Sequence, residues 1–223
     1  MKLSEIKDYL DERFYEVLVN NNIEELRPAQ EKAIKQGLFG KKNMLVCTPT
    51  ASGKTLIAEL AMVNELLKNP GSKAIYLAPL KALVNEKYKD FLNRYNHLIK
   101  IAKSTGDLDS SDGFLANFDL ILTTPEKLDS LIRHKVDWIR RISVLVIDEI
   151  HLLNDVERGP VLEIIITLLR TILKNVRIIG LSATIGNAYE LAEWLDAELV
   201  EDDWRPVKLK QGILFDDELE FFE

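Results

Sequence analysis

From residue 40 onward, short apolar runs alternate with longer segments in which apolar residues recur every three or four positions. The short runs predict strands at residues 44–48, 73–78, 100–104, 120–123, 144–148 and 178–182. The longer segments predict helices at residues 54–67, 83–95, 126–132, 160–173 and 188–195. Strands and helices in this order form a parallel sheet with helices on both faces. The pattern therefore predicts an α/β domain on a mostly parallel, twisted sheet.

The first 39 residues carry a helical pattern of their own. Ser4 is a candidate helix cap, and Phe14, Val17 and Leu18 fit one apolar face. Pro28 favours the start of a second helix. We expect this segment to pack on the main domain.

The last residues have a different pattern. Residues 207–214 alternate enough to predict an edge strand. We therefore expect three parts: a helical segment at 1–39, the main domain at 40–203, and an edge strand with the start of a linker to a second domain at 204–223.

The segment between the first predicted strand and its helix has the composition of a phosphate loop. It consists of Thr48, Pro49, Thr50, Ala51, Ser52, Gly53, Lys54 and Thr55. Loop N–H groups and the positive end of the following helix form an anion cradle. Gly53 lets the chain approach a phosphate, Lys54 supplies positive charge, and the Thr55 hydroxyl can hold Mg²⁺. The general motif begins with glycine where this chain has Thr48, but the flanking strand and helix argue against an accidental Gly-Lys-Thr.

A second candidate site follows the apolar run at residues 144–147, which is typical of a strand buried on both faces. Asp148 and Glu149 come directly after it. Ligands of open α/β sheets bind at the carboxyl ends of the strands, so both carboxylates should lie near the phosphates. Asp148 is placed to coordinate Mg²⁺, and Glu149 to orient or deprotonate the attacking water.

Three further positions have two possible interpretations. The amide of Gln30 can pair with an adenine edge, or it can be an exposed helix residue. Ser182, with Ala183 and Thr184, can couple the nucleotide site to a moving part, or can form an ordinary strand-end turn. His151 can hydrogen-bond across to that strand, or pack in the core.

Three loops follow strand ends and should face the same rim of the sheet. They contain Leu80 and Lys81, then Gly106 with Asp107, and then Thr124, Pro125 and Glu126. Backbone N–H groups and hydroxyls in such loops bind nucleic-acid phosphates without reading bases. Each loop alone is also typical of a helix cap. Their shared rim favours a track for a nucleic-acid strand.

Composition narrows the function less than these motifs do. The net charge of −7 disfavours a nucleic-acid binder unless a local patch does the binding. The single Cys47 excludes an internal disulfide, and no signal peptide is visible, which favours a cytoplasmic location. The apolar run at 161–173 is too short to span a membrane. The few His and Cys residues are not at metal-ligand spacing.

Together these motifs resemble the superfamily-two DExH helicases, and most closely the Ski2-like branch with its archaeal Hjm-type DNA repair helicases. The resemblance covers nearly the whole chain. It rests most on residues 49–55, 79–83, 148–152, 182–187 and 204–207.

This resemblance implies a RecA-like P-loop NTPase domain that uses ATP and Mg²⁺ for 3′-to-5′ unwinding of forked DNA. Lys54, Asp148 and Glu149 would be catalytic, with Thr55 and Asp148 at the metal. Gln30 would contact adenine. His151, Ser182, Ala183 and Thr184 would couple hydrolysis to movement. The strand track would include Leu80, Lys81, Gly106, Thr124, Pro125 and Glu126.

Such helicases also have a second RecA-like domain with arginine fingers, a winged helix and a ratchet domain. We expect these partners to lie outside this chain, which then corresponds to a first motor domain. Residues 1–223 alone should bind ATP weakly, hydrolyse it very slowly and unwind nothing.

Three alternatives remain from the sequence. An RNA helicase of the same branch would hold its strand by the same phosphate contacts. A nucleotide-dependent switch or scaffold would not need Glu149 to activate water. A small-molecule P-loop kinase would need an Arg-rich lid, and no such segment occurs between the predicted strands.

Overall fold

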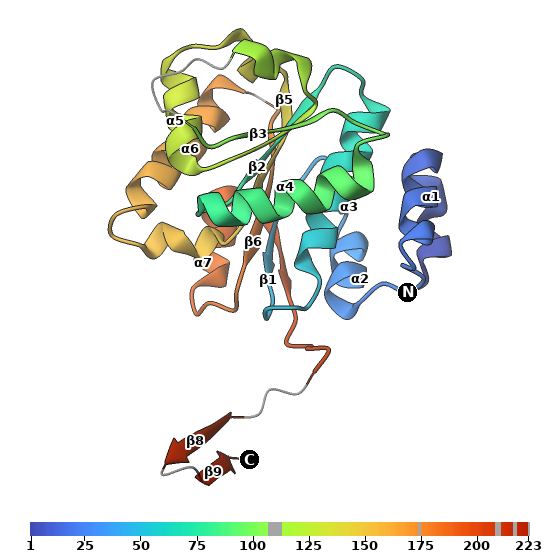
Figure 1. Ribbon diagram of the computed structural model, residues 1–223, viewed down its shortest axis with the longest axis vertical. Coiled ribbons are helices and arrows are strands. Elements are labelled where there is room, and N and C mark those ends of the chain that lie inside the picture. Colours follow the sequence, from blue (N-terminus) through green and yellow to red (C-terminus); the bar gives the residue numbers. More distant parts are fainter. Residues whose placement is uncertain (107–112, 174, 208–210, 216–217, 223) are drawn as a thin grey trace.

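The structure, a computed structural model, describes residues 1–106, 113–173, 175–207, 211–215 and 218–222. Its centre is a seven-stranded sheet in the order β3-β4-β2-β5-β6-β1-β7, in which all neighbouring strands are parallel (Figure 1). The strands are β1 (Asn43–Cys47), β2 (Lys73–Leu77), β3 (Ile101–Ser104), β4 (Leu120–Thr123), β5 (Ile142–Ile147), β6 (Arg177–Ser182) and β7 (Ala197–Glu201). The predicted α/β fold class is confirmed.

Helices cover both faces of this sheet (Figure 1). They are α1 (Glu12–Asn20), α2 (Pro28–Lys35), α3 (Lys54–Lys68), α4 (Lys81–Tyr95), α5 (Pro125–Arg133), α6 (Gly159–Ile172) and α7 (Ala188–Leu195). Short 3₁₀ helices join them: η1 (Leu3–Tyr9), η2 (Gly113–Asn117), η3 (Asp137–Arg141) and η4 (Ile150–Asn154). The helices predicted between residues 54 and 195 all form, with ends that differ by a few residues.

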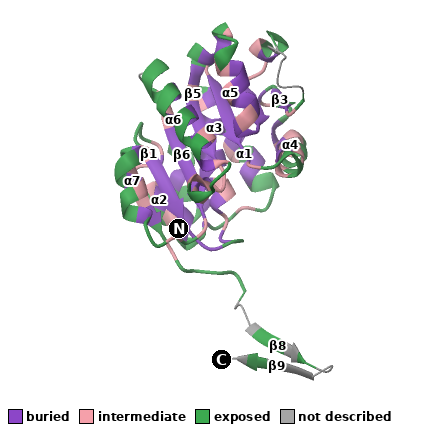
Figure 2. Cartoon of the chain, turned by 90° about the vertical axis from the view of Figure 1, so that its left-hand side faces the viewer, coloured by how far each residue is buried: buried purple, intermediate pink, exposed green. Residues whose placement is uncertain are grey.

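The two faces of the sheet have separate hydrophobic cores. One core packs α1, α2, α3 and α4 against side chains such as Val46 and Tyr76. The other packs α5, α6 and α7 against side chains such as Leu45 and Leu145. Successive strand residues point to opposite faces, so the central strands are apolar throughout. Figure 2 shows the resulting buried interior in purple, with exposed helix surfaces in green.

A strand forms within the predicted C-terminal segment, but it does not join the main sheet. One edge of the main sheet is β7, which was not predicted because the segment is short and carries Glu198 and Glu201. Strand β8 (Gln211–Phe215) instead pairs antiparallel with β9 (Glu218–Phe222) in a separate two-stranded sheet. That hairpin lies away from the main body (Figure 2). Of the predicted strand at 207–214, residues 208–210 lie outside the described part.

The N-terminal segment packs on the main domain, but Ser4 does not cap its first helix. Residue Lys2 precedes η1, and the side chain of Asp11 caps α1 by accepting from the Arg13 N–H. The Asn64 side chain on α3 accepts from the Asp11 N–H at 2.9 Å. The segment is therefore attached directly to the helix that follows the phosphate loop. Among the described residues, no helix has the length and apolar character needed to cross a membrane.

Candidate nucleotide and nucleic-acid site

Strand order brings the main candidate residues to one rim of the sheet. Strand β6 lies between β1 and β5, with Cys47 paired to Ser182 and Ile147 paired to Gly180. Adjacent strands are about 4.8 Å apart, so the ends of β1 and β5 are separated by about 10 Å. The phosphate loop, Ser182 and the carboxylates after β5 therefore emerge side by side.

The loop itself is held by internal contacts. The Thr48 hydroxyl lies 2.8 Å from the Ser52 hydroxyl, and the Ser52 N–H donates to the Pro49 carbonyl at 3.3 Å. Gly53 has φ +92°, and a Cβ there would lie 2.5 Å from Gln30 Nε2. Glycine is therefore required at Gly53 for both conformation and space. Thr48, in place of the usual first glycine, stabilises the loop through its hydroxyl.

Lys54 provides a test of whether an anion fits this loop. Its side chain is buried, and its amine has no hydrogen-bond partner among the described residues. A buried ammonium without a partner is costly. A triphosphate against the loop would supply the missing negative charge, so the site fits this ligand.

The metal donors are also chemically suitable. Thr55 offers a hydroxyl and Asp148 a carboxylate, and Mg²⁺ at phosphate loops completes its shell with water and phosphate oxygens. The described residues contain no cluster of three His, Cys, Asp or Glu side chains that could hold a metal without the nucleotide. A magnesium ion here would depend on the bound phosphates.

Arg27 and Gln30 support the loop from the start of α2. The Arg27 guanidinium donates to the Ala51 carbonyl at 2.6 Å, and the Gln30 amide donates to the Gly53 carbonyl at 2.9 Å. The Gln30 oxygen accepts from the Arg27 N–H at 2.8 Å. Ala51 is held in a left-handed conformation, φ 65°. In this structure Gln30 is buried rather than an exposed helix residue, and its amide fixes the loop.

Arg27 is a site residue that the sequence analysis missed. Its guanidinium also lies over the Trp204 ring, 5.6 Å from the centroid. The signal available was its place three residues before Gln30, within the same capping turn. The long-range contact to Trp204 could not be inferred from that spacing.

Asp148 is oriented by two donors. The Tyr76 hydroxyl donates to Oδ2 at 2.7 Å, and the Glu149 N–H donates to Oδ1 at 3.0 Å. Burial and the Asp148 carboxylate raise the pKa of Tyr76 well above its ordinary value, so the phenol stays protonated and keeps donating. Tyr76 was also missed, because within the apolar strand it is indistinguishable from a core residue.

Glu149 has a strained backbone, with φ +53°. A left-handed non-glycine residue of this kind costs about 1–3 kcal/mol and is enriched at functional sites. His151 Nδ1 lies 3.4 Å from Glu149 Oε2. Its side chain is 34% exposed, so His151 is not a packed core residue. The structure therefore shows a contact for His151 that neither of the two sequence interpretations included.

The coupling residues differ in their surroundings. Ser182 is buried, its hydroxyl has no hydrogen-bond partner among the described residues, and its carbonyl accepts from the Thr48 N–H at 3.2 Å. Ala183 is half-buried, and Thr184 is exposed. The strand end therefore contacts the phosphate loop directly, while the residues after it turn outward.

The expected strand track lies along the ends of β2, β3 and β4. Leu80, Lys81 and Gly106 are exposed there, whereas Thr124 and Pro125 are buried. The Thr124 hydroxyl accepts from the Lys127 N–H and caps α5, as the plainer interpretation predicted. The expected contribution of Asp107 falls outside the described residues.

These strand ends are bonded to one another. The Thr123 hydroxyl donates to the Ser104 carbonyl at 2.7 Å, and the Ala78 N–H donates to the Thr123 carbonyl at 3.1 Å. The three loops therefore share a rim, continuous with the end of β5 through the bond from the Asp148 N–H to the Leu77 carbonyl.

The parallel sheet and the loop after β1 define a RecA-like nucleotide-binding domain of the phosphate-loop class. Comparison with protein families agrees with this class and refines it. The chain belongs to the DEAD/DEAH box helicase family, whose model matches residues 27–191.

Its relatives include archaeal proteins named ATP-dependent DNA helicase Hel308. That of Pyrococcus horikoshii is 53% identical over 96% of this chain, and that of Methanocaldococcus jannaschii is 55% identical over 94%. The chain spans 29% and 18% of these two relatives, respectively. The predicted resemblance to Ski2-like DExH helicases is confirmed.

A solved structure is also similar. The helicase MrfA, crystallised bound to DNA, matches with a TM-score of 0.72 and 27% sequence identity. The match covers 87% of this chain and 30% of that one.

Proposed function

We propose that this chain is the first motor domain of an ATP-dependent 3′-to-5′ DNA helicase that acts in repair or at stalled forks. It couples ATP hydrolysis to translocation along single-stranded DNA. The observation that carries the proposal is the buried Lys54 amine, which has no hydrogen-bond partner in the described part of the chain and lies on the same rim as Asp148 and Glu149. Half-identical relatives named as DNA helicases support the choice of DNA over RNA.

In this mechanism the loop residues and Lys54 bind the triphosphate, and Arg27 and Gln30 hold the loop in shape. Thr55 and Asp148 would hold Mg²⁺, which neutralises charge on the phosphates when bound. Glu149 orients the attacking water and accepts its proton. His151 and Ser182 to Thr184 transmit the change, and Leu80, Lys81, Gly106 and residues 124–126 contact the strand.

The other walls of the nucleotide site are assigned to further domains of the full-length protein. A second RecA-like domain supplies arginine to the transition state, and accessory domains guide the strand. Residues 1–223 alone are therefore expected to bind ATP weakly and to separate no strands. Robust unwinding by residues 1–223 alone would contradict the proposal that further domains are needed for strand separation.

The test is ATPase stimulation of the full-length protein by single-stranded DNA and RNA of matched sequence. A DNA helicase responds strongly to DNA and weakly to RNA. Greater stimulation by RNA would favour an RNA helicase of the same branch. Nucleotide binding without turnover under either condition would favour the switch or scaffold.

A further inference from the structure

Two side chains contact the predicted metal ligands from the strand-track side of the molecule. Tyr76, in β2, donates its hydroxyl proton to Asp148 Oδ2 at 2.7 Å. Lys87, in α4, places Nζ 3.5 Å from Thr55 Oγ1. Neither belongs to the phosphate loop or to the acidic strand end.

One connection joins these two contacts. Tyr76 is in the strand before residues 78–80, and Lys87 is in the helix after them. That loop contains Leu80 and leads into Lys81, both exposed on the proposed strand track. A pocket lined by Pro79, Asp148, Glu149 and neighbouring residues lies directly between the loop and the carboxylates.

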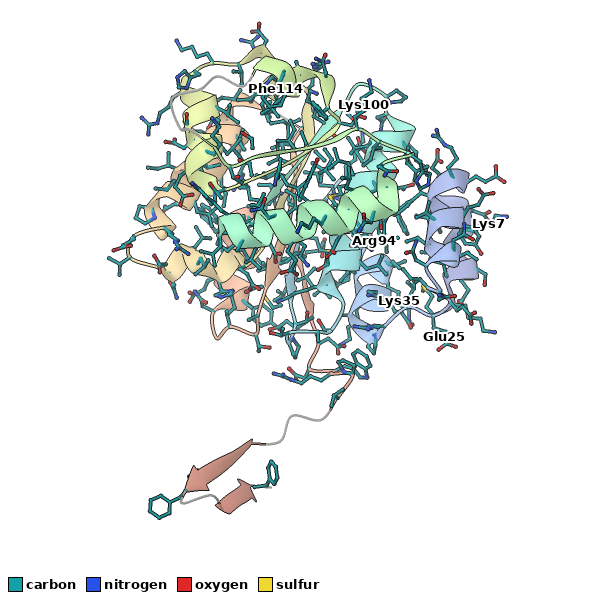
Figure 3. All side chains as sticks on the ribbon, viewed as in Figure 1. Lys7, Glu25, Lys35, Arg94, Lys100 and Phe114 are labelled. Carbon is teal, nitrogen blue, oxygen red and sulfur yellow. The ribbon has the colours of Figure 1, made fainter. Side chains whose placement is uncertain are left out.

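Helix α4 is rigidly joined to the helix that carries Thr55. The Arg94 guanidinium donates to both oxygens of Glu59 in α3, at 2.6 and 2.8 Å, and the Tyr95 hydroxyl also donates to that buried carboxylate. Figure 3 labels Arg94 near the end of α4 that approaches α3. The Phe91 ring packs edge-on against Tyr76, 5.3 Å between centroids. Helix α4 therefore contacts both the helix that carries Thr55 and the tyrosine that is hydrogen-bonded to Asp148.

We propose that the unit formed by β2, residues 78–80 and α4 connects the strand track to the metal end of the nucleotide site. Tyr76 and Lys87 are its positioning residues. This inference rests on the proposed function, because it concerns the Mg²⁺ that accompanies ATP.

Tyr76 and Lys87 are expected to have opposite effects on metal binding. Tyr76 holds one oxygen of Asp148 by a hydrogen bond, as outer-sphere partners of metal ligands do, so it favours metal binding. Lys87 directs a positive charge at the Thr55 oxygen that the metal requires. Like charges repel, so the Lys87 ammonium would oppose a metal ion held by the Thr55 oxygen and would have to move away for that ion to bind. Lys87 already interacts electrostatically with the buried Glu59 carboxylate in the same helix as Thr55.

The experiment uses the full-length protein and a fluorescent ADP analogue. The measured quantity is the ratio of nucleotide affinity with Mg²⁺ to nucleotide affinity in EDTA, determined without turnover. We expect Tyr76→Phe to lower this ratio about tenfold. Lys87→Met should raise it several-fold. Affinity in EDTA should change by no more than about twofold in either variant.

Two residues of α4 provide matched controls for these substitutions. Tyr88 packs beneath Lys103, and Lys89 is exposed, so Tyr88→Phe and Lys89→Met should leave the ratio within about twofold of the wild type. Equal losses with and without Mg²⁺ in the Tyr76 and Lys87 variants would indicate a merely structural role and overturn the proposal. A Lys87→Met ratio below the wild-type value would also overturn it.

A second measurement tests whether the strand track and the metal end of the nucleotide site are connected. Single-stranded oligothymidylate should change the Mg²⁺ ratio of the wild type and leave that of a variant carrying both Tyr76→Phe and Lys87→Met unchanged. The same change in both proteins would refute the link. A wild-type protein that binds no nucleotide would instead overturn the proposed function itself.

Discussion

Polar side chains lie on both the nucleotide side and the strand-track side of the rim, but their hydrogen bonding differs between the two sides. On the nucleotide side, the Lys54 amine and the Ser182 hydroxyl are buried without hydrogen-bond partners in the described structure, and Glu149 is strained. On the track side, polar groups bond to the fold itself, as Thr123 does to Ser104 and Thr124 does to α5.

This difference indicates how each side works. Buried polar groups without partners and a strained backbone are expected to favour binding of an anionic ligand that supplies the missing interactions. Loops whose polar groups are already bonded offer a preformed surface for a phosphate backbone of any sequence. The nucleotide side is therefore expected to respond to single substitutions far more strongly than the track side.

The largest effect is expected at Glu149. Glu149→Gln removes the base and should slow ATP turnover by about 10³-fold, because general-base catalysis contributes about 10²–10⁴-fold. Nucleotide affinity should be unchanged. Steady-state hydrolysis and equilibrium nucleotide binding of the full-length protein check both parts. Unchanged turnover would assign Glu149 another role.

Lys54→Ala should weaken nucleotide binding and turnover by about 10²-fold, since a preorganised positive charge at the phosphates is lost. The nucleotide-free protein should be as stable as the wild type or more stable, because a buried amine without a partner is removed. Thermal unfolding without ligand measures this. Marked destabilisation would show that the amine has a partner in the free protein.

Arg94→Met tests the connection between the two sides. It leaves the Glu59 carboxylate buried without its main counter-charge and should cost about 3 kcal/mol, or roughly 10 °C in the unfolding midpoint. Arg133→Met, in an exposed pair with Asp129, is the control and should show no measurable shift.

The same variant has a predictable pH dependence. Burial raises the pKa of Glu59 above its ordinary value of 4.5, and Arg94 opposes that rise. A raised pKa means that stability is greatest when the carboxyl is protonated and falls as pH rises through the folded pKa. The stability gap between Arg94→Met and wild type should therefore narrow as the pH is lowered, because the carboxyl that has lost its counter-charge becomes protonated. A gap that widens on acidification would contradict the assignment.

On the track side, Lys81→Ala should weaken single-stranded DNA binding only several-fold and uniformly across sequences. The slope of log affinity against log salt should fall by about 0.7, the value for one phosphate contact on a single strand. Binding titrations at several salt concentrations measure the slope. An unchanged slope would remove Lys81 from the track.

The smallest effect is expected at Cys47, directly before the phosphate loop. Burial raises the pKa of its thiol to about 11, so little thiolate forms at pH 8. Alkylation by iodoacetamide should be very slow in the folded protein and fast in guanidinium chloride. Rapid labelling of the folded chain would mean that β1 opens readily.

The sequence predicted most of the sheet because its central strands are apolar throughout and its helices have a clear period. The phosphate loop and Asp148-Glu149 could be predicted for a related reason. Each is a short contiguous segment that directly follows a predicted strand. Strand β7 was not predicted because it is short and its acidic residues interrupt the apolar pattern.

The sequence could not predict the roles of Tyr76, Arg27 and Lys87, because the residues that they contact are distant in sequence. A tyrosine in an apolar strand gives no sign that its hydroxyl meets a carboxylate 72 residues away. The capping role of Thr124 was predicted, and local sequence cannot decide whether a cap also touches a ligand.

The most direct test of this account is a structure of the protein with Mg²⁺ and a non-hydrolysable ATP analogue. We predict that Lys54 Nζ lies about 3 Å from an outer phosphate oxygen. Thr55 and Asp148 should flank the same metal ion, and Glu149 should face the terminal phosphate. A nucleotide bound elsewhere, or Lys54 and Asp148 facing different ligands, would contradict it.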